Sequence, residues 1–573
     1  MDSPPDKRWR LRGRFPEGDL AAAPYPPLIR HLLYHREIRT PQQAAAYFDS
    51  APIEHDPLLL PDIGPAMERI RSAIDSGQKI AIYGDFDVDG VTASAILIEG
   101  LREVGAKVES YLPDRFSEGY GVNIEAIDSL AARGVRLMIT ADCGTSSVEE
   151  IAHASTLGVD TIVLDHHTVP PELPAAVALV NPKRPGNRYG EPELASGGLA
   201  YKLMSALYTS FGREYPGERY LDLVALSTIC DVAPLRGENR SLVRRGLVAL
   251  SRAERPGIRA LLDASGVDPA TVDSDTIGYT LGPRLNAAGR LAHARLALDL
   301  LMETDRDRAM ERALELTDLN LQRRQATADA MALARSILAD EDPAAPLIFV
   351  GHEDIPAGIV GIVAGRLAEE YYRPAVVYQR DAETSRASCR SIPEFDISAA
   401  LRSCGGLMVR FGGHRAAAGF TVANDKLPAL KQALLSVAGE QLAGIELEPV
   451  IDIDAEVALK HLNGKIIEAI SRMAPFGQEN PEPTFRSNNV EVIDAWNMGG
   501  DGSHLRLKLR DGRVTYPAVA FSRGMGNGEA EALPPEMPPD LCPGAHLDIV
   551  YTFTRDRSDG LELRLADFRP TQS

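Results

Sequence analysis

Short apolar runs alternate with amphipathic segments along the first half of the chain. Several runs are apolar and short enough to be β-strands, at 79–84, 107–112, 136–141, 160–165 and 177–181. Apolar residues spaced three or four positions apart predict helices around them, at 64–76, 91–104, 122–133, 147–156 and 197–211. Strands that alternate with helices form a parallel sheet covered by helices on both faces. The first half is therefore predicted to be an α/β domain.

The second half changes pattern twice. A long Ala-, Leu- and Arg-rich stretch, 305–339, predicts a single connecting helix, and it lacks the strict heptad spacing of a coiled-coil dimer. From 344 to 440 strand and helix patterns return on a smaller scale. After the acidic linker 446–449, short strands separated by Gly and Asn turns predict a β-barrel. In the strand 504–510 the alternation places three leucines on one face and basic residues on the other.

The composition is that of a globular protein without extracellular features. The 573 residues allow three or four domains, and the five cysteines are scattered with no CxxC pair, which favours a reducing compartment. The chain start lacks the apolar core of a signal peptide and no run of eighteen apolar residues exists, so a cytoplasmic protein without a membrane span is expected. A net charge of −20 argues against nucleic-acid binding, unless a local basic channel is masked by acidic groups elsewhere.

Asp85, Asp87 and Asp89 follow the first apolar strand at alternate positions. Carboxylates this close repel one another, and a divalent cation among them relieves the repulsion. Their oxygens are the hard ligands that Mg²⁺ and Mn²⁺ prefer. Two other interpretations exist: a calcium-binding EF-hand loop, which would need a bidentate Glu where this chain has Ile96, and a solvated acidic turn.

Further polar residues stand at the ends of later elements. Asp142 follows the strand 136–141, His166 and His167 follow the strand 160–165, and Asp231 follows an apolar helix. Taken singly, Asp142 fits a helix N-cap and the histidine pair fits a structural or surface role. Since ligands bind outside the carboxyl ends of the strands in an open α/β sheet, all these side chains are expected at one rim.

These stretches carry a resemblance to a known family. Residues 84–90, Asp142, 165–167 and Asp231 resemble, in order, motifs I to IV of the DHH phosphoesterase superfamily. The resemblance runs from about residue 60 to the end, and it is strongest to the bacterial exonucleases of this superfamily that are specific for single-stranded DNA. It implies a parallel-sheet DHH domain joined by a long helix to a smaller α/β DHHA1 domain, followed by a β-barrel OB-like domain. The domains expected are an N-terminal lead-in packed on the first domain (1–60), DHH (61–304), connector helix (305–343), DHHA1 (344–442) and OB-like (450–573).

The resemblance also implies two divalent metal ions, Mn²⁺ or Mg²⁺, at the rim. Two cations together can activate water and neutralise charge on the attacked phosphate, so no protein nucleophile is required. His167 would contact or orient the scissile phosphate. Catalytic roles are implied for Asp87, Asp89, Asp142, His166, His167 and Asp231. The implied ligands are Asp85, Asp87 and bridging Asp142 for one ion, and Asp89, Asp142, His166 and Asp231 for the other.

Substrate contacts are implied in all three domains. They are Arg115, Arg284, Arg290, Ser388, Arg390, His414, Arg506 and Lys508. The structural alternatives are salt-bridged arginines at a helix start for 282–290, a tight turn for the loop 386–391 and the run 411–420, and a solvated face for the barrel strand. Ala387 and Cys389 depart from the small glycine-rich run usual in the family. Trp496, Phe521 and Phe476 can stack on bases, although core packing is the simpler expectation.

The expected activity is 5′-to-3′ exonucleolytic hydrolysis of single-stranded DNA to mononucleotides, in DNA repair and recombination. Polarity and the preference for DNA come from the resemblance alone. The expected partners are single-stranded DNA, a single-strand-binding protein and a helicase, with the protein a monomer. One alternative is a phosphodiesterase for short oligonucleotides or cyclic dinucleotides, against which the extra barrel argues. Another is a non-catalytic DNA-binding replication scaffold, against which the full set of ligands argues.

Overall fold

The computed structural model describes residues 7–16, 18–49, 51–115, 118–119, 121–498, 504–521, 541–555 and 560–571. Three residues of the predicted polar loop 114–121 lie outside these ranges, at 116, 117 and 120. The chain forms two compact units. The catalytic unit, as we call it, holds Ser50–Arg323 and Pro475–Pro481, and the second unit holds Met1–Asp49, Arg324–Ala474 and Glu482–Ser573.

The catalytic unit is built on a five-stranded, all-parallel sheet. Its strands are β2 (Lys79–Gly84), β3 (Lys107–Tyr111), β4 (Val135–Ala141), β5 (Asp160–Leu164) and β6 (Ala178–Val180). They lie in the order β3-β2-β4-β5-β6. Strand β3 therefore pairs with one edge of β2, and β4, the next strand in the chain, pairs with the other edge. That reversal makes a topological switch point between β2 and β4, the place where open α/β sheets bind ligands.

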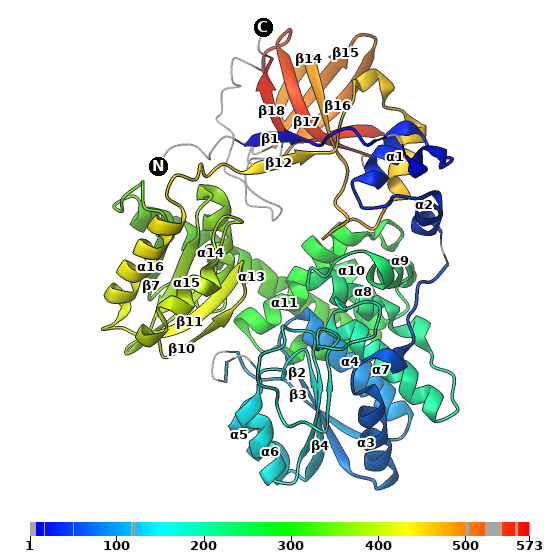
Figure 1. Ribbon diagram of the computed structural model, residues 1–573, viewed down its shortest axis with the longest axis vertical. Coiled ribbons are helices and arrows are strands. Elements are labelled where there is room, and N and C mark those ends of the chain that lie inside the picture. The colour runs from blue at the N-terminus through cyan, green and yellow to red at the C-terminus, as the bar shows by residue number, and fades with distance from the viewer. Residues whose placement is uncertain are drawn as a thin grey trace. The chain divides into compact units, whose positions relative to one another are not determined.

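Helices cover both faces of this sheet, as Figure 1 shows. Helices α3 (Ile63–Asp75), α4 (Val88–Glu103) and α7 (Ser196–Ser210) lie on one face, and α5 (Ile124–Ala132) and α6 (Val148–Thr156) on the other. The apolar residues of each face are buried in their own core cluster. The predicted strands and helices of this part are confirmed, and the largest shift is in α4, which begins at Val88 instead of Val91.

A helical extension completes the catalytic unit. It contains α8 (Leu221–Cys230), α9 (Gly237–Arg252), α10 (Pro256–Ala264), the π-helical turn η5 (Thr276–Leu281), α11 (Gly282–Leu291) and α12 (Arg295–Met302). Helix α8 packs directly on α4. The predicted long helix is confirmed as α13 (Arg306–Leu338), whose first part belongs to the catalytic unit and whose remainder, from Arg324, belongs to the second. None of the helices in the described residues has the length and hydropathy needed to cross a membrane.

The second unit contains a mixed five-stranded sheet in the order β10-β11-β9-β8-β7. Its strands are β7 (Ile348–His352), β8 (Ala375–Arg380), β9 (Thr384–Arg390), β10 (Arg410–Gly413) and β11 (Ala417–Ala423). The expectation of a loop at 386–391 is wrong, because β9 is an inner strand paired on both edges. Small residues such as Ala387 and Cys389 face its core where larger apolar ones usually mark a strand, so the sequence pattern concealed it.

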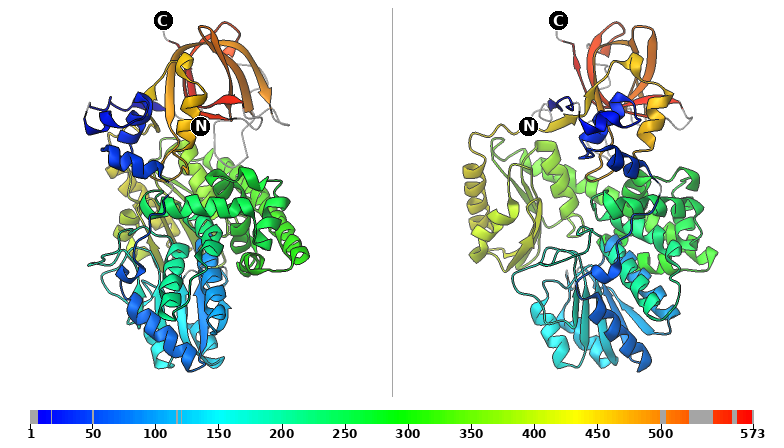
Figure 2. Two further views of the ribbon diagram at one scale, coloured as in Figure 1. Left: turned by 90° about the vertical axis from the view of Figure 1, so that its right-hand side faces the viewer. Right: turned by 45° about the vertical axis from the view of Figure 1, so that its right-hand side comes forward.

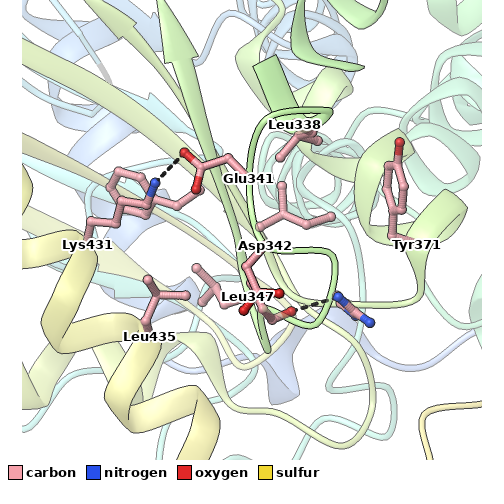
Figure 3. Close-up of a pocket in the computed structure, with 11 residues that line it drawn as sticks. Leu338, Glu341, Asp342, Leu347, Tyr371, Lys431 and Leu435 are labelled. Atoms are coloured by element: carbon pink, nitrogen blue, oxygen red, sulfur yellow. Dashed lines mark hydrogen bonds and ion pairs between the residues drawn. The ribbon is translucent and has the colours of Figure 1, made fainter. Parts of the chain in front are cut away.

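Helices α14 (Val360–Tyr371), α15 (Ile397–Ser403) and α16 (Leu427–Gln441) cover this mixed sheet. Figure 3 shows a small pocket beside it, lined by residues of α13, α14, α16, β7 and the segment 341–347. At its edge Lys431 Nζ lies 2.7 Å from Glu341 Oε1, and the Arg373 guanidinium donates to the carbonyls of Pro343 and Ala345. These contacts hold the segment that follows α13 against the sheet.

The C-terminal strands close into a barrel. They are β13 (Ala455–Glu456), β14 (Thr484–Met498), β15 (His504–Asp511), β16 (Val514–Ala520), β17 (His546–Arg555) and β18 (Leu561–Pro570). The sheet order β13-β14-β15-β16-β18-β17 is closed by a further pairing of β14 with β17, and Figure 2 shows these strands curving round one interior. Helix α17 (Gly464–Ser471) lies in the chain between β13 and β14. The expected α/β fold class with an OB-like barrel is confirmed.

The N-terminal lead-in belongs with the barrel. Strand β1 (Arg8–Leu11) pairs in parallel with β12 (Val450–Ile453), and helices α1 (Pro27–Tyr34) and α2 (Pro41–Phe48) follow it. The Trp9 indole donates to Asp567 at 2.8 Å, and the Tyr47 hydroxyl donates to the Met473 carbonyl at 3.0 Å. The expectation that residues 1–60 pack on the first domain is therefore wrong for the described residues up to Asp49. A four-residue strand with two arginines carries no sequence pattern that predicts which strand it pairs with.

Candidate metal centre

Each inner strand of the catalytic sheet delivers an aspartate at its carboxyl end. Asp85 follows β2, Asp142 follows β4 and Asp165 follows β5. Their backbone N–H groups donate to the last residue of the neighbouring strand, with N···O distances of 3.0, 3.0 and 3.2 Å. The sheet pairing thus continues one residue past each strand. This fixes the backbone of the three aspartates at the switch point between β2 and β4.

Asp87 and Asp89 are positioned by helix α4. Asp87 is its N-cap and accepts from the N–H groups of Asp89 and Gly90, at 2.9 and 3.2 Å. Asp89 therefore stands in the first helical turn. Its carboxylate accepts from the N–H groups of Ser196 and Gly197, which begin α7, and from the Ser227 hydroxyl. The N-terminal end of α7 therefore holds this buried carboxylate in place.

Asp142 adopts a left-handed backbone conformation, with φ of +68°. Aspartate is one of the few side chains that tolerate this region, and Gly144, two residues on, also has a positive φ. The Ser196 hydroxyl donates to the Asp142 carboxylate at 3.0 Å. One serine therefore orients two carboxylates, since its backbone binds Asp89 and its side chain binds Asp142.

His166 lies at the centre of the carboxylates. Its Nε2 is 3.2 Å from Asp142 and 3.6 Å from Asp89, and its Nδ1 is 3.7 Å from Asp231, the residue that ends α8. The ligating atoms form three groups, within each of which all lie within 4.8 Å of one another. The groups are Asp85 with Asp87 and Asp142, Asp89 with His166 and Asp231, and Asp142 with His166 and His167.

The donor set fits divalent cations. Asp85 Oδ1 and His166 Nε2 are buried, and neither has a hydrogen-bond partner among the described residues. Buried polar atoms are normally satisfied, so an orphaned oxygen and an orphaned imidazole nitrogen in one cluster call for a ligand. Carboxylate oxygens suit Mg²⁺ and Mn²⁺, and a neutral imidazole nitrogen is a common metal ligand in proteins. The residues present can hold two such ions.

Burial and mutual repulsion raise the pKa values of several acidic groups in this cluster. Burial raises the pKa of Asp85 and of Asp142 well above their usual range, and neighbouring carboxylates add to the effect. The pKa of Asp231 rises to about 8, from burial and then from the Asp89 charge. Burial lowers the pKa of His166 and keeps its ring neutral. Cations would stabilise the ionised carboxylates and would find a neutral imidazole ready to bind.

His167 is held in the opposite state by Asp165. Burial alone lowers the pKa of His167, but its hydrogen bond to Asp165, with Nδ1···O of 2.7 Å, and the surrounding carboxylates raise it to about 9. The Asp165 carboxylate also accepts from the N–H groups of Thr145, His166 and His167. Of the two adjacent histidines, His166 is thus a neutral ring, which suits a metal ligand. His167 is an imidazolium, which suits a phosphate contact.

The predicted substrate arginines of the catalytic unit lie at this cluster or on α11. The Arg115 guanidinium stacks over the Phe86 ring, 4.8 Å from its centroid, and its charge acts on Asp85. Arg284 and Arg290 lie on α11, and Arg284 donates to the Thr280 carbonyl at 2.8 Å. The same helix contributes Asn286, whose side-chain oxygen accepts from the Val88 N–H at the start of α4. Helix α11 is therefore hydrogen-bonded to the start of α4, next to Asp87.

The remaining predicted contacts belong to the second unit, and their roles stay predictions. Ser388 and Arg390 share one face of β9, where the guanidinium donates to the Ser388 hydroxyl at 3.0 Å. His414 stands in the turn between β10 and β11. On the barrel, Lys508 is exposed, and Arg506 lies 3.4 Å from Glu562.

Two aromatic residues of the barrel are more exposed than expected. Trp496 is 42% exposed and Phe521 is 52% exposed, so the expectation of core packing is wrong for both. Trp496 is the register partner of Arg506 across β14 and β15, and His504 packs edge-on against Phe521. Exposed aromatic rings on a barrel suit stacking on the bases of a single strand.

Several residues of the site were absent from the predicted set. They are Asp165, Ser196, Gly197, Ser227 and Asn286. The Ser196-Gly197-Gly198 run offered a signal, since small residues at the start of a helix allow close approach of a carboxylate. Asp165 was visible in its motif but was not separated from the two histidines as their anchor.

Three family models match the chain. They are the DHH family, N-terminal domain (residues 79–228), the DHHA1 domain (344–440) and the RecJ OB domain (453–562). The single-stranded-DNA-specific exonuclease RecJ of Dickeya dadantii is 35% identical over 481 residues, which cover 80% of this chain and 83% of that protein. RecJ of Bacillus subtilis is 35% identical over 527 residues, and the match covers 91% of this chain but 65% of that longer protein.

Solved structures agree with the sequence matches. The crystal structure of RecJ in complex with Mn²⁺ from Thermus thermophilus superposes with a TM-score of 0.82 at 28% identity, covering 99% of this chain and 80% of that one. The crystal structure of RecJ with Mg²⁺ from the same organism gives a TM-score of 0.75 at 27% identity, covering 99% and 79%. Both structures hold a metal ion of the kind that suits the donor set described above.

Proposed function

Because the chain belongs to the RecJ family of single-stranded-DNA-specific exonucleases, we propose that it removes mononucleotides from the 5′ end of single-stranded DNA with two divalent metal ions, Mn²⁺ or Mg²⁺. The observation that carries this proposal is the set of three overlapping ligand groups at the switch point, which contain a buried oxygen and a buried nitrogen without partners among the described residues. The two metal-ligand sets that the resemblance implies are the assignment we propose.

When bound, the pair of cations would polarise the phosphodiester and lower the pKa of the attacking water. The chain's own residues do the rest. Asp142 belongs to two of the ligand groups and so would be the ligand that the two ions share. His167, kept cationic by Asp165, can donate a hydrogen bond to a phosphate oxygen, and Arg115 adds positive charge beside Asp85.

The second unit would bind the strand beyond the reacting phosphate. Ser388, Arg390 and His414 are proposed for the terminal phosphate region, and Arg506 and Lys508 for the backbone further along. The half-exposed rings of Trp496 and Phe521 support this role of the barrel, because stacking on bases is independent of sequence. We further propose a cytoplasmic monomer that acts with a single-strand-binding protein and a helicase in DNA repair and recombination.

The test is digestion of 5′- and 3′-labelled single strands and blunt duplexes, with and without Mn²⁺. We expect metal-dependent release of mononucleotides from the 5′ end of the single strand and at least tenfold slower attack on the duplex. A length series separates this activity from that of a phosphodiesterase for short oligonucleotides, which would prefer the shortest substrates. Equal rates on duplex and single strand, or hydrolysis that survives chelation of metals, would refute the proposal.

A further inference from the structure

Residues 475–481 belong to the catalytic unit, although the chain up to Ala474 and from Glu482 onward belongs to the second. They form a tight turn. Gly477 and Asn480 exchange two backbone hydrogen bonds, of 3.0 and 3.1 Å, and the buried Asn480 side chain donates to the Pro475 carbonyl at 2.7 Å. Glu479 inside the turn has a left-handed φ of +58°. The segment has a defined shape of its own, and we call it the 475–481 turn.

This turn contacts the segment that follows Asp231. The Leu235 N–H donates to the Gln478 carbonyl at 2.8 Å, and the Arg236 guanidinium lies 2.8 Å from the Glu479 carboxylate. A Cβ atom at Gly477 would stand 2.8 Å from Leu235 Cδ1, so the turn backbone lies directly on this buried side chain. Three separate contacts therefore hold Leu235 and Arg236, four and five positions after Asp231.

The backbone between these contacts and Asp231 is strained. Helix α8 ends with the Asp231 N–H bonded to the Ser227 carbonyl, and the Ala233 N–H then returns to the Thr228 carbonyl at 3.0 Å. Such an ending requires a left-handed residue between them, a place that glycine usually takes. Here it is Val232, with φ of +59°. A β-branched residue is unfavourable in that region and persists there only when its surroundings enforce it.

Packing of the Val232 side chain cannot enforce this left-handed conformation, because that side chain is 64% exposed. The enforcement must come from the two ends of the segment. Helix α8 fixes the end that begins at Asp231, and the 475–481 turn fixes the end at Leu235 and Arg236. Release of the second end would let the strained backbone relax, and Asp231 lies next to the strained residue.

We propose that the 475–481 turn is a clamp that positions Asp231 for the ligand group of Asp89, His166 and Asp231. The ligand group of Asp85, Asp87 and Asp142 is fixed by β2, β4 and the N-cap of α4, none of which the clamp touches through the contacts described above. The clamp therefore acts on one of the two cations. This inference rests on the two-metal site of the proposed function, and Gly477, Gln478 and Glu479 are positioning residues within it.

The experiment is titration of the metal-free full-length protein with Mn²⁺ by calorimetry and by the Mn²⁺ electron paramagnetic resonance signal. Asp87→Asn and Asp231→Asn identify which binding step belongs to which group. For Gly477→Val, whose added side chain meets Leu235, we expect at least tenfold weaker binding at the Asp231 site and less than a twofold change at the other. The control is Gly464→Val, because nothing lies within 4 Å of a Cβ at Gly464.

A second pair of variants tests the ion pair. Arg236→Ala should weaken the Asp231 site about threefold. Arg335→Ala, which breaks an ion pair of similar length with Glu370 at 2.9 Å, should leave both sites unchanged.

The rescue variant separates positioning from a general loss of structure. Adding Val232→Gly to Gly477→Val should restore most of the lost affinity, because glycine adopts the left-handed conformation without strain. The clamp is overturned if Gly477→Val binds both ions as the unaltered protein does, or if both sites weaken together and Val232→Gly restores neither. If the unaltered protein itself binds fewer than two Mn²⁺ ions, the proposed two-metal site fails and the inference falls with it.

Discussion

The rim of the catalytic sheet and the outer face of the barrel both present charged side chains, but they hold them in opposite ways. At the rim Asp85, Asp89 and Asp142 are buried within a few ångströms of one another, and the cationic groups His167 and Arg115 stand beside them. On the barrel Arg506 pairs with Glu562 and Arg510 pairs with Glu491, in contact with solvent.

The difference follows from the dielectric around each set of charges. Charges in a buried cluster interact strongly, and each must be met by a hydrogen bond, a counter-charge or a cation. Exposed pairs are screened and contribute little individually. Single changes at the rim should therefore have large and specific effects, whereas changes on the barrel should have small and graded ones.

The largest effect should come from Asp142→Asn. It weakens a ligand that belongs to two of the groups, and loss of cation stabilisation in the transition state corresponds to several kcal/mol, or roughly 10³-fold in kcat. Mn²⁺ stoichiometry and single-turnover hydrolysis measure it. Asp75→Asn, an exposed aspartate at the end of α3, is the control and should change neither quantity. A variant that retained half of its activity would place the shared ligand elsewhere.

The second effect is a pH dependence of metal affinity. The pKa of Asp231 in the metal-free protein is raised to about 8, so at pH 6 the group is protonated and the ion must displace that proton. Apparent Mn²⁺ affinity should therefore rise by about tenfold per pH unit from 6 to 8 and level off above. Calorimetry in two buffers of different ionisation enthalpy counts the released protons. Affinity that is flat across this range would contradict the buried, repelled state of the carboxylate.

The third effect concerns Asp165→Asn. The amide cannot hold His167 as an imidazolium, so the pKa of His167 in the metal-free protein should fall from about 9 towards its ordinary value. We expect kcat to fall by about 10- to 100-fold, as for other partners of active-site histidines, with Mn²⁺ stoichiometry unchanged. NMR titration of the imidazole checks the shift. The matched control is Asp128→Asn, which removes the partner of the part-exposed His153 at the same 2.7 Å.

The smallest effect should appear on the barrel. Trp496→Ala removes a half-exposed ring, and stacking on one base is worth about 1 kcal/mol at its lower limit, which is roughly fivefold in affinity. The dissociation constant for long single strands should rise by that factor while kcat stays constant. Val248→Ala, an exposed residue of the catalytic unit, serves as control. A fall in kcat with unchanged binding would assign Trp496 to the chemistry and would remove the contrast between the two regions.

The arrangement of the first domain was predictable because its signals are local. Each strand of the parallel sheet is a short apolar run, and Asp85, Asp142 and the histidine pair each follow one of them closely. The carboxyl ends of parallel strands meet at one edge, so sequence order alone predicted a common rim. The alternation in 504–510 was equally local, and its leucines are buried as expected.

The predictions that failed concerned segments whose partners are distant in the chain. β1 carries no pattern that points to β12, more than four hundred residues later, and β9 resembles a loop until its neighbours on both edges are known. The exposure of Trp496 could not be read from a strand whose face changes at a β-bulge.

The sequence by itself determined which groups could bind metal and the strand ends from which they emerge, because residue type and hydrophobic periodicity are written locally. Only the tertiary structure decided that Ser196 connects Asp89 with Asp142 and that Asp165 keeps His167 protonated beside a neutral His166. It also decided that residues 475–481 hold the chain after Asp231. Hydrogen bonds and burial between distant segments set these charges and positions, and no local pattern encodes which segments will meet.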